Sequence, residues 1–154
     1  MIFILSAIII VLDQLSKYAA INYLMESAPY IIIPNFFRLS YVENFGAAFG
    51  ILQNRKIFFI IVTCIVVVSL SLFLIKNYYR INIFMRIGLS LLLGGTIGNF
   101  IDRVRFGYVV DFISFRLFNR YEFPVFNIAD IAIVIGTSII LILVLFDKYE
   151  ARRI

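Results

Sequence analysis

Four long apolar segments follow one another along the chain, separated by stretches that carry most of the charged residues. The segments run roughly over 2–24, 57–75, 87–104 and 128–146. Each approaches the ~20 apolar residues that an α-helix needs to cross a bilayer. The pattern therefore predicts four transmembrane helices.

Two of the connections, 27–56 and 105–127, are longer than a helix hairpin needs and are rich in aromatic and β-branched residues. Segment 30–50 joins an extended apolar run to an alternating stretch that ends at Gly46 and Gly50. This pattern is typical either of a sheet that holds an extended substrate or of an interfacial aromatic belt. We expect a mainly α, integral membrane fold with a small membrane-surface β-sheet and an outer loop.

The composition supports a membrane protein. Of the 154 residues, 63% are hydrophobic, whereas soluble domains contain roughly 45–50% apolar residues. The mean hydropathy is +1.03. We interpret 1–154 as a single membrane domain, since the apolar runs leave no room for a separate soluble module. The N-terminus lacks a basic start and a small-residue cleavage site, so we expect the first span to be retained.

The net charge of +5 comes from cations that lie next to apolar runs. Such placement favours membrane lipids with anionic headgroups as partners rather than nucleic acid. The positive-inside rule assigns one side of the bilayer, and both termini, to the cytoplasm on the strength of Lys76, Arg80, Arg86, Lys148, Arg152 and Arg153. The bias is modest, because the opposite connections carry Arg38, Arg55, Lys56, Arg105, Arg116 and Arg120.

Residue types that are absent or rare exclude several classes of catalytic site. The chain contains no histidine, which excludes Ser-His-Asp and Cys-His machinery and any His-ligated metal site. Cys64 is the single cysteine and sits in an uncharged apolar run, so no intramolecular disulfide forms and we interpret it as a packing or lipid-facing residue. We expect neither a metal nor a cofactor.

Several ionisable residues fall within the predicted spans, where a charge costs about 2.5–3.5 kcal/mol on insertion scales. Asp13 and Lys17 are four residues apart, in the order that favours an ion pair on one helix face. Asp102 and Arg103 end the third span, shortly after Asn99. We interpret them chiefly as a structural polar network, with direct chemistry as the alternative.

Asp111 and Asp130 have no cation beside them. Asp111 lies in YVVDFISF and Asp130 in FNIADIAIVIG, and both are expected at the outer edge of the bilayer. Two carboxyl groups that meet in apolar surroundings share one proton, which makes a general acid and base pair. Three hypotheses remain open from the residues alone: a catalytic pair, an ion or proton relay, and simple capping of the last helix by Asp130.

Five motifs together resemble lipoprotein signal peptidase, also called signal peptidase II: DQLSK (13–17), ENFGAAFG (43–50), GGTIGNFIDR (94–103), GYVVDFI (107–113) and FNIAD (126–130). The resemblance covers the whole chain, in order. It implies an aspartyl endopeptidase that removes the signal peptide from bacterial prolipoproteins, cutting before the diacylglyceryl-modified cysteine. It also implies a multi-pass protein of the inner membrane with its active site near the outer face. We expect the lipidated precursor as partner and a monomeric enzyme.

In that family the catalytic aspartates are those of VVDF and FNxAD, which here are Asp111 and Asp130. The resemblance also carries over a substrate-binding or supporting set, namely Asn44, Gly46, Gly95, Asn99, Arg103, Asn127 and Ala129. Arg103 is expected to pair with Asp102 or, alternatively, with a peptide carbonyl. Asp13, Lys17 and Asp102 form the expected polar network. One position departs from the family pattern, because Ile131 stands where serine is common.

Three other functions compete with this interpretation. A small transporter or proton-conducting protein also needs carboxylates at membrane depth. A peptidase that used Ser16 with Lys17 is disfavoured, because residues one apart on a helix do not face each other. A structural membrane partner without activity leaves the two membrane-edge carboxylates unexplained.

Overall fold

The computed structural model describes residues 2–46, 55–118 and 121–151. The expected outer-loop motif continues from 47 to 50 and so passes outside the described residues, as does Gly50. Three of the cations used for the orientation also lie outside them, namely Arg120, Arg152 and Arg153.

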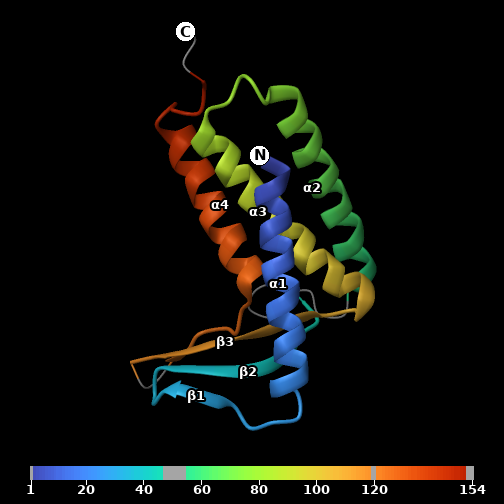
Figure 1. The fold of residues 1–154 in the computed structure, drawn as a ribbon, viewed down its shortest axis with the longest axis vertical. Coiled ribbons are helices and arrows are strands. Elements are labelled where there is room, and N and C mark those ends of the chain that lie inside the picture. The colour runs from blue at the N-terminus through green and yellow to red at the C-terminus, as the bar shows by residue number, and fades with distance from the viewer. Residues whose placement is uncertain (1, 47–54, 119–120, 152–154) are drawn as a thin grey trace.

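Four helices form one bundle (Figure 1). They are α1 (Ile2–Leu24), α2 (Lys56–Asn77), α3 (Ile83–Arg105) and α4 (Ile128–Leu145). Each is long and apolar enough to cross a membrane. α1 begins and α4 ends at the same end of the bundle, with a sheet at the opposite end. The predicted fold class is confirmed: a membrane protein with four spans and a small sheet.

Side-chain caps explain where α3 and α4 begin. The side chain of Asn82 accepts a hydrogen bond of 2.9 Å from the amide of Met85, so α3 begins at Ile83, earlier than the apolar run alone predicts. α4 begins after Asn127 with a reciprocal capping box, in which Asn127 and Asp130 each accept from the other's backbone amide. Asn127 therefore caps the last helix, and Asp130 supplies the reciprocal bond of the capping box.

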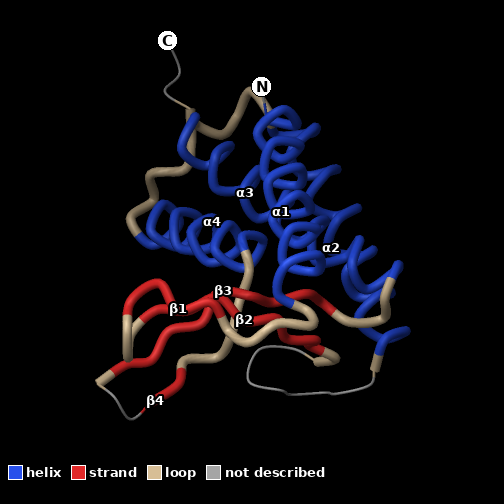
Figure 2. The backbone as a smooth tube through the Cα atoms, turned by 60° about the horizontal axis from the view of Figure 1, so that its bottom comes forward, coloured by secondary structure: helices blue, strands red, loops and turns tan. Residues whose placement is uncertain are grey.

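The two long connections pair with each other in a four-stranded antiparallel sheet of order β1-β2-β3-β4 (Figures 1 and 2). Its strands are β1 (Tyr30–Ile33), β2 (Phe37–Asn44), β3 (Val109–Leu117) and β4 (Tyr121–Glu122). β2 and β3 are in register at Val42 with Asp111 and at Asn44 with Val109. Segments that are far apart in sequence thus meet at the end of the bundle.

Side chains alternate across β3, as in any strand. Val110 and Phe112 belong to a buried cluster with Ala20 of α1. Val109 and Asp111 instead line a cavity beside α4. The alternation therefore turns Asp111 away from α1 and toward the start of α4.

Small residues bring α3 close to α1 and α4, which is the usual way for membrane helices to pack. A Cβ added at Gly94 would lie 2.9 Å from the carbonyl oxygen of Ser6, and one at Gly136 would lie 2.6 Å from the carbonyl oxygen of Gly88. At Gly95 it would collide with the carbonyl oxygen of Ala129. Gly95 and Ala129 thus lie at the α3–α4 contact.

Candidate active site

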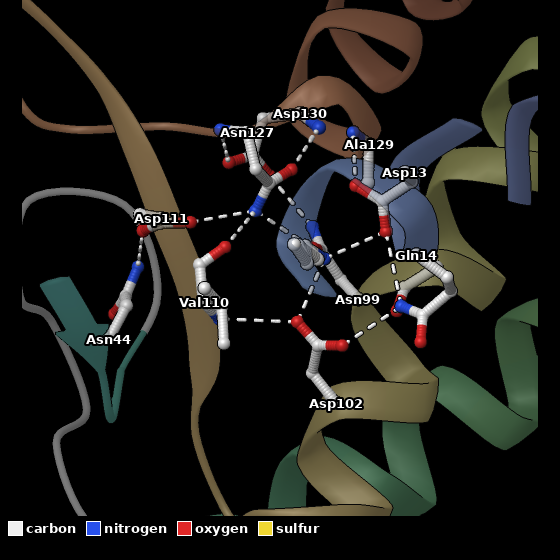
Figure 3. A network of polar contacts seen from close by, with 12 residues as sticks. Asp13, Gln14, Asn44, Asn99, Asp102, Val110, Asp111, Asn127, Ala129 and Asp130 are labelled. Atoms are coloured by element: carbon white, nitrogen blue, oxygen red, sulfur yellow. Dashed lines mark hydrogen bonds and ion pairs between the residues drawn. The ribbon is translucent and has the colours of Figure 1, made fainter. Parts of the chain in front are cut away.

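Asp111 and Asp130 line the same cavity, which has a volume of about 590 Å³. Asp111 comes from β3 and Asp130 from the first turn of α4 (Figure 3). The cavity also receives Asn44, Gly46, Asn99 and Arg103 from the expected supporting set.

Asn127 connects the two aspartates (Figure 3). Its Nδ2 donates to Oδ1 of Asp111 at 2.7 Å, and its Oδ1 accepts from the backbone amide of Asp130 at 2.9 Å. The side chain is fully buried. One amide group therefore fixes the strand that carries Asp111 against the helix that carries Asp130.

Amide groups supply the remaining donors to both carboxylates. Nδ2 of Asn99 donates to Oδ1 of Asp130 at 2.7 Å, and the backbone amide of Asn127 reaches Oδ2 of Asp130 at 3.3 Å. Nδ2 of Asn44 donates to Oδ2 of Asp111 at 3.0 Å. Within the described ranges, neither Asp111 nor Asp130 forms an ion pair.

These surroundings raise the pKa of Asp111 to about 7. Burial is the largest cause, because it disfavours the charged form, and the negative charge of Asp130 adds to it. Hydrogen bonds from Asn44 and Asn127 act in the opposite direction but do not cancel the increase. Asp111 can therefore hold or release a proton near neutral pH.

A second group of carboxylates, Asp13 and Asp102, is fully buried next to the cavity residue Asn99. Nζ of Lys17 is 2.8 Å from Oδ2 of Asp13 and 2.9 Å from Oδ2 of Asp102. It also donates to Oδ1 of Asn99 at 2.9 Å. The expected network of Asp13, Lys17 and Asp102, called here the lysine cluster, thus touches the active-site cavity through Asn99.

The lysine cluster also holds the backbone beside each cavity aspartate. Asp13 accepts from the amide of Ala129 at 2.9 Å, and Asp102 accepts from the amide of Val110 at 3.1 Å. Ala129 directly precedes Asp130, and Val110 directly precedes Asp111. Because Lys17 joins the two carboxylates, the cluster sets the position of the strand relative to the helix.

Two residues of this arrangement were missed in the sequence analysis. Nε2 of Gln14 donates to Oδ1 of Asp102 at 2.9 Å. Gly98 leaves room for Asp13, since an added Cβ would lie 2.6 Å from Oδ2 of Asp13. Both residues fall inside the motifs quoted above, but neither ionises, so the search for charged groups passed over them.

Among the described residues, the expected pairing of Arg103 with Asp102 does not form, and the disfavoured pairing of Ser16 with Lys17 is not assembled either. Arg103 makes no ion pair with Asp102 in the described part of the chain, and its Nη2 instead donates to the carbonyl oxygen of Gly46 at 3.1 Å. Asp102 instead forms its ion pair with Lys17. The hydroxyl of Ser16 donates to the carbonyl oxygen of Asp13 in its own helix at 2.8 Å, so Ser16 and Lys17 are not assembled as a nucleophile and base.

The family described as signal peptidase (SPase) II matches residues 5–146, which is most of the chain. The chain belongs to the signal peptidase II family. Relatives in this family include the lipoprotein signal peptidase of Caldanaerobacter subterraneus subsp. tengcongensis, 47% identical over 146 residues, which cover 95% of this chain and 97% of the relative. The lipoprotein signal peptidase of Clostridioides difficile is 46% identical and covers 99% of this chain and 100% of its own length.

Two solved structures of bacterial membrane enzymes have the same fold as this chain. One bacterial membrane enzyme aligns with a TM-score of 0.86 at 39% identity, covering 96% of this chain and 88% of its own. A second aligns with a TM-score of 0.82 at 39% identity, covering 95% of this chain and 93% of its own. The fold is thus shared along almost the whole chain.

Proposed function

We propose that this chain is an aspartic endopeptidase that removes the signal peptide from prolipoproteins, with Asp111 and Asp130 as its catalytic residues. The substrate is a precursor cut before its diacylglyceryl-modified cysteine. Family membership supports the reaction class. The observation that carries the choice of residues is that Asp111 and Asp130 line one cavity, are joined by Asn127, and accept hydrogen bonds from amide groups without an ion pair among the described residues.

In the proposed mechanism Asp111 is the protonated member and Asp130 the ionised one. Asp130 takes a proton from a water molecule, and the resulting hydroxide attacks the scissile carbonyl carbon. Asp111 donates its proton to the carbonyl oxygen, which neutralises the charge that develops there. When the C–N bond breaks, Asp130 returns its proton to the leaving nitrogen and Asp111 recovers one from the hydroxyl.

Supporting roles follow from the contacts. Asn44, Asn99 and Asn127 orient the two carboxylates, because each donates to one of them. Arg103 and Gly46 line the same cavity and are linked by a hydrogen bond. We assign them to binding of the substrate backbone.

The proposed setting is the inner membrane of a bacterium, with both termini in the cytoplasm and the active site near the outer face. Support comes from the described cations Lys76, Arg80, Arg86 and Lys148, which follow or precede spans on one side. The sheet lies at the other end of the bundle (Figure 1), and the cavity is lined by residues of β3 and of the first turn of α4 beside it. Water then needs to reach only the headgroup region for hydrolysis.

The test uses the purified protein and a synthetic diacylglyceryl-cysteine precursor, with product masses as the readout. Asp111→Asn and Asp130→Asn are each expected to bind the precursor and to lower the cleavage rate by a factor of about 10²–10⁴, the usual contribution of general acid–base catalysis. Asp147→Asn is the matched control, because Asp147 is exposed after the end of α4.

If Asp111→Asn or Asp130→Asn cleaved the precursor at the wild-type rate, the proposed catalytic pair would be wrong. A wild-type protein that leaves the precursor intact, but carries ions across a liposome membrane, would favour the transport hypothesis instead.

A further inference from the structure

Arg103 lines the cavity without a carboxylate partner among the described residues. It lies in the last turn of α3 and is half-buried. Within the described ranges it forms no ion pair, and its guanidinium donates one hydrogen bond, from Nη2 to the carbonyl oxygen of Gly46 at 3.1 Å. A guanidinium has five N–H donors. Most donors of Arg103 therefore have no acceptor in the part of the chain that the structure describes.

An aromatic ring holds the guanidinium of Arg103. Its Cζ is 4.8 Å from the centroid of the Phe59 ring, within the limit of about 6 Å for a cation–π interaction. Phe59 is half-buried in the first turn of α2. Its amide donates to the carbonyl oxygen of Arg55 at 3.1 Å, so the start of the helix fixes its backbone.

The start of α2 lies beside the end of α3 (Figure 1). Nζ of Lys56 in α2 donates to the carbonyl oxygen of Val104 in α3 at 3.5 Å, where a cation also suits the negative end of the helix dipole. Contacts thus run in both directions, because α2 supplies Lys56 to α3 and α3 supplies Arg103 to α2. Together they fix the ring of Phe59 relative to the cavity arginine.

An aromatic partner has a different chemical effect on arginine from that of a carboxylate. A carboxylate neutralises the guanidinium and accepts up to two of its N–H groups. A ring attracts the cation through its quadrupole but has no oxygen that accepts a conventional hydrogen bond. An arginine that is already restricted also loses less rotamer freedom when a substrate binds. Phe59 therefore restricts Arg103 while the charge and the remaining donors stay available.

We propose that Phe59 is a positioning residue for Arg103, which it holds at the cavity so that the free N–H groups bind a carbonyl oxygen of the substrate backbone. This inference rests on the proposed function, in which Arg103 binds the substrate. Phe59 does not itself line the cavity, so it acts through Arg103. Its loss weakens binding of substrate and transition state alike, which raises KM and leaves kcat nearly unchanged.

The experiment replaces Phe59 by phenylalanines that carry one, two or three ring fluorines. Fluorine withdraws electron density from the ring and weakens its attraction for a cation, with little change in shape. KM for the diacylglyceryl-cysteine precursor is expected to rise with each fluorine, to about two- to thirtyfold for the trifluoro ring, the range that a cation–π interaction contributes. We expect kcat to change less than about twofold. The same series at Phe73, an exposed ring of α2, is the matched control and should leave KM unchanged.

A double-mutant comparison tests whether Phe59 acts through Arg103. Phe59→Leu removes the ring but keeps an apolar side chain, so KM is expected to rise as it does for the trifluoro ring. In an Arg103→Gln background the same change is expected to raise KM less than about twofold, because the cation is absent. Phe59→Tyr retains an aromatic face and is expected to keep KM within about twofold of the wild-type value.

Either of two results would overturn the inference. One is a KM that stays constant through the fluorinated series at Phe59, since packing alone would then explain the contact. The other is an equal rise in KM from Phe59→Leu with and without Arg103→Gln.

The two proposals fail in different ways. If the wild-type protein cleaves no diacylglyceryl-cysteine precursor, the proposed function is wrong. If it cleaves the precursor and KM does not vary with fluorination of Phe59, only the positioning of Arg103 by Phe59 is wrong.

Discussion

Two groups of carboxylates lie side by side in this protein and have different partners; Asp13, Asp102 and Asp111 are buried, and Asp130 is half-buried. In the lysine cluster, Asp13 and Asp102 share Nζ of Lys17 at 2.8 and 2.9 Å. In the cavity, Asp111 and Asp130 receive hydrogen bonds from asparagine and backbone amides. A nearby cation favours the ionised form of its carboxylate partners, and neutral amides do so more weakly while they orient the carboxylate. The first arrangement suits structure and the second suits acid–base chemistry.

The two groups also depend on each other. The lysine cluster binds the amides of Ala129 and Val110, which adjoin the two cavity aspartates. It also reaches Asp130 through Asn99, whose Oδ1 accepts from Lys17 while its Nδ2 donates to Asp130. Holding reacting groups in fixed geometry is a large part of catalysis. Damage to the lysine cluster should therefore affect folding first and activity as a result.

Lys17→Met is the strongest test of whether the lysine cluster serves structure while the cavity aspartates serve chemistry. It leaves two carboxylates without their cation, and breaking a buried pair in this way typically costs about 3–5 kcal/mol. We expect a large fall in thermal stability and a parallel loss of cleavage. Melting curves in detergent provide the measurement, and Lys76→Met at an exposed position of α2 is the control. Asp13→Asn retains the Lys17–Asp102 pair and should lose less stability than Lys17→Met.

If Lys17→Met melted like the wild-type protein yet failed to cleave, the lysine would have a direct part in the chemistry. The comparison between the two groups would then be wrong.

The pH dependence of cleavage tests the proton on Asp111. Its pKa is raised to about 7 by burial and by Asp130, so the protonated form needed for donation is present below that pH and lost above it. We expect the rate constant to fall about tenfold per pH unit above pH 7. Rates measured between pH 5 and 9 on the detergent-solubilised enzyme give the profile. A rate that stays flat through pH 9 would assign the donor role to another group.

A smaller effect is expected from Asn44→Ala. Its amide donates to Asp111 and favours the ionised carboxylate, so removing it should raise the pKa of Asp111 further. The alkaline fall in rate should then move to higher pH, with a decrease in cleavage of roughly three- to tenfold at neutral pH from the lost hydrogen bond. Asn22→Ala, at an exposed position of α1, should leave the pH profile unchanged. A shift to lower pH would contradict the assigned role of Asn44.

Apolar runs and short motifs were sufficient to predict the four spans and the small sheet. They worked because crossing a bilayer requires long uninterrupted helices, and because caps such as Asn127 sit directly before the apolar run they start. The order of Asp13 and Lys17 on one helix also predicts their ion pair, which forms at 2.8 Å. These features depend on residues that are close in the sequence, so they can be predicted from it.

Contacts between distant segments could not be derived in this way. The partners of Asp102 are Lys17, Gln14 and the amide of Val110, whereas proximity in sequence pointed to Arg103. Backbone amides carry no residue-type signal, and Gln14 has no charge. The double role of Asn127, which both caps α4 and holds Asp111, likewise depends on β3 lying against the start of α4.

The central claim is that Asp111 and Asp130 hold one proton between them near neutral pH. Infrared difference spectroscopy of the protein with isotope-labelled aspartate measures it most directly, because a protonated carboxyl group has its own C=O stretching band. We expect one such band at pH 6 that titrates near pH 7, disappears in Asp111→Asn and persists in Asp147→Asn. Absence of the band at pH 6, or its survival in Asp111→Asn, would contradict the account.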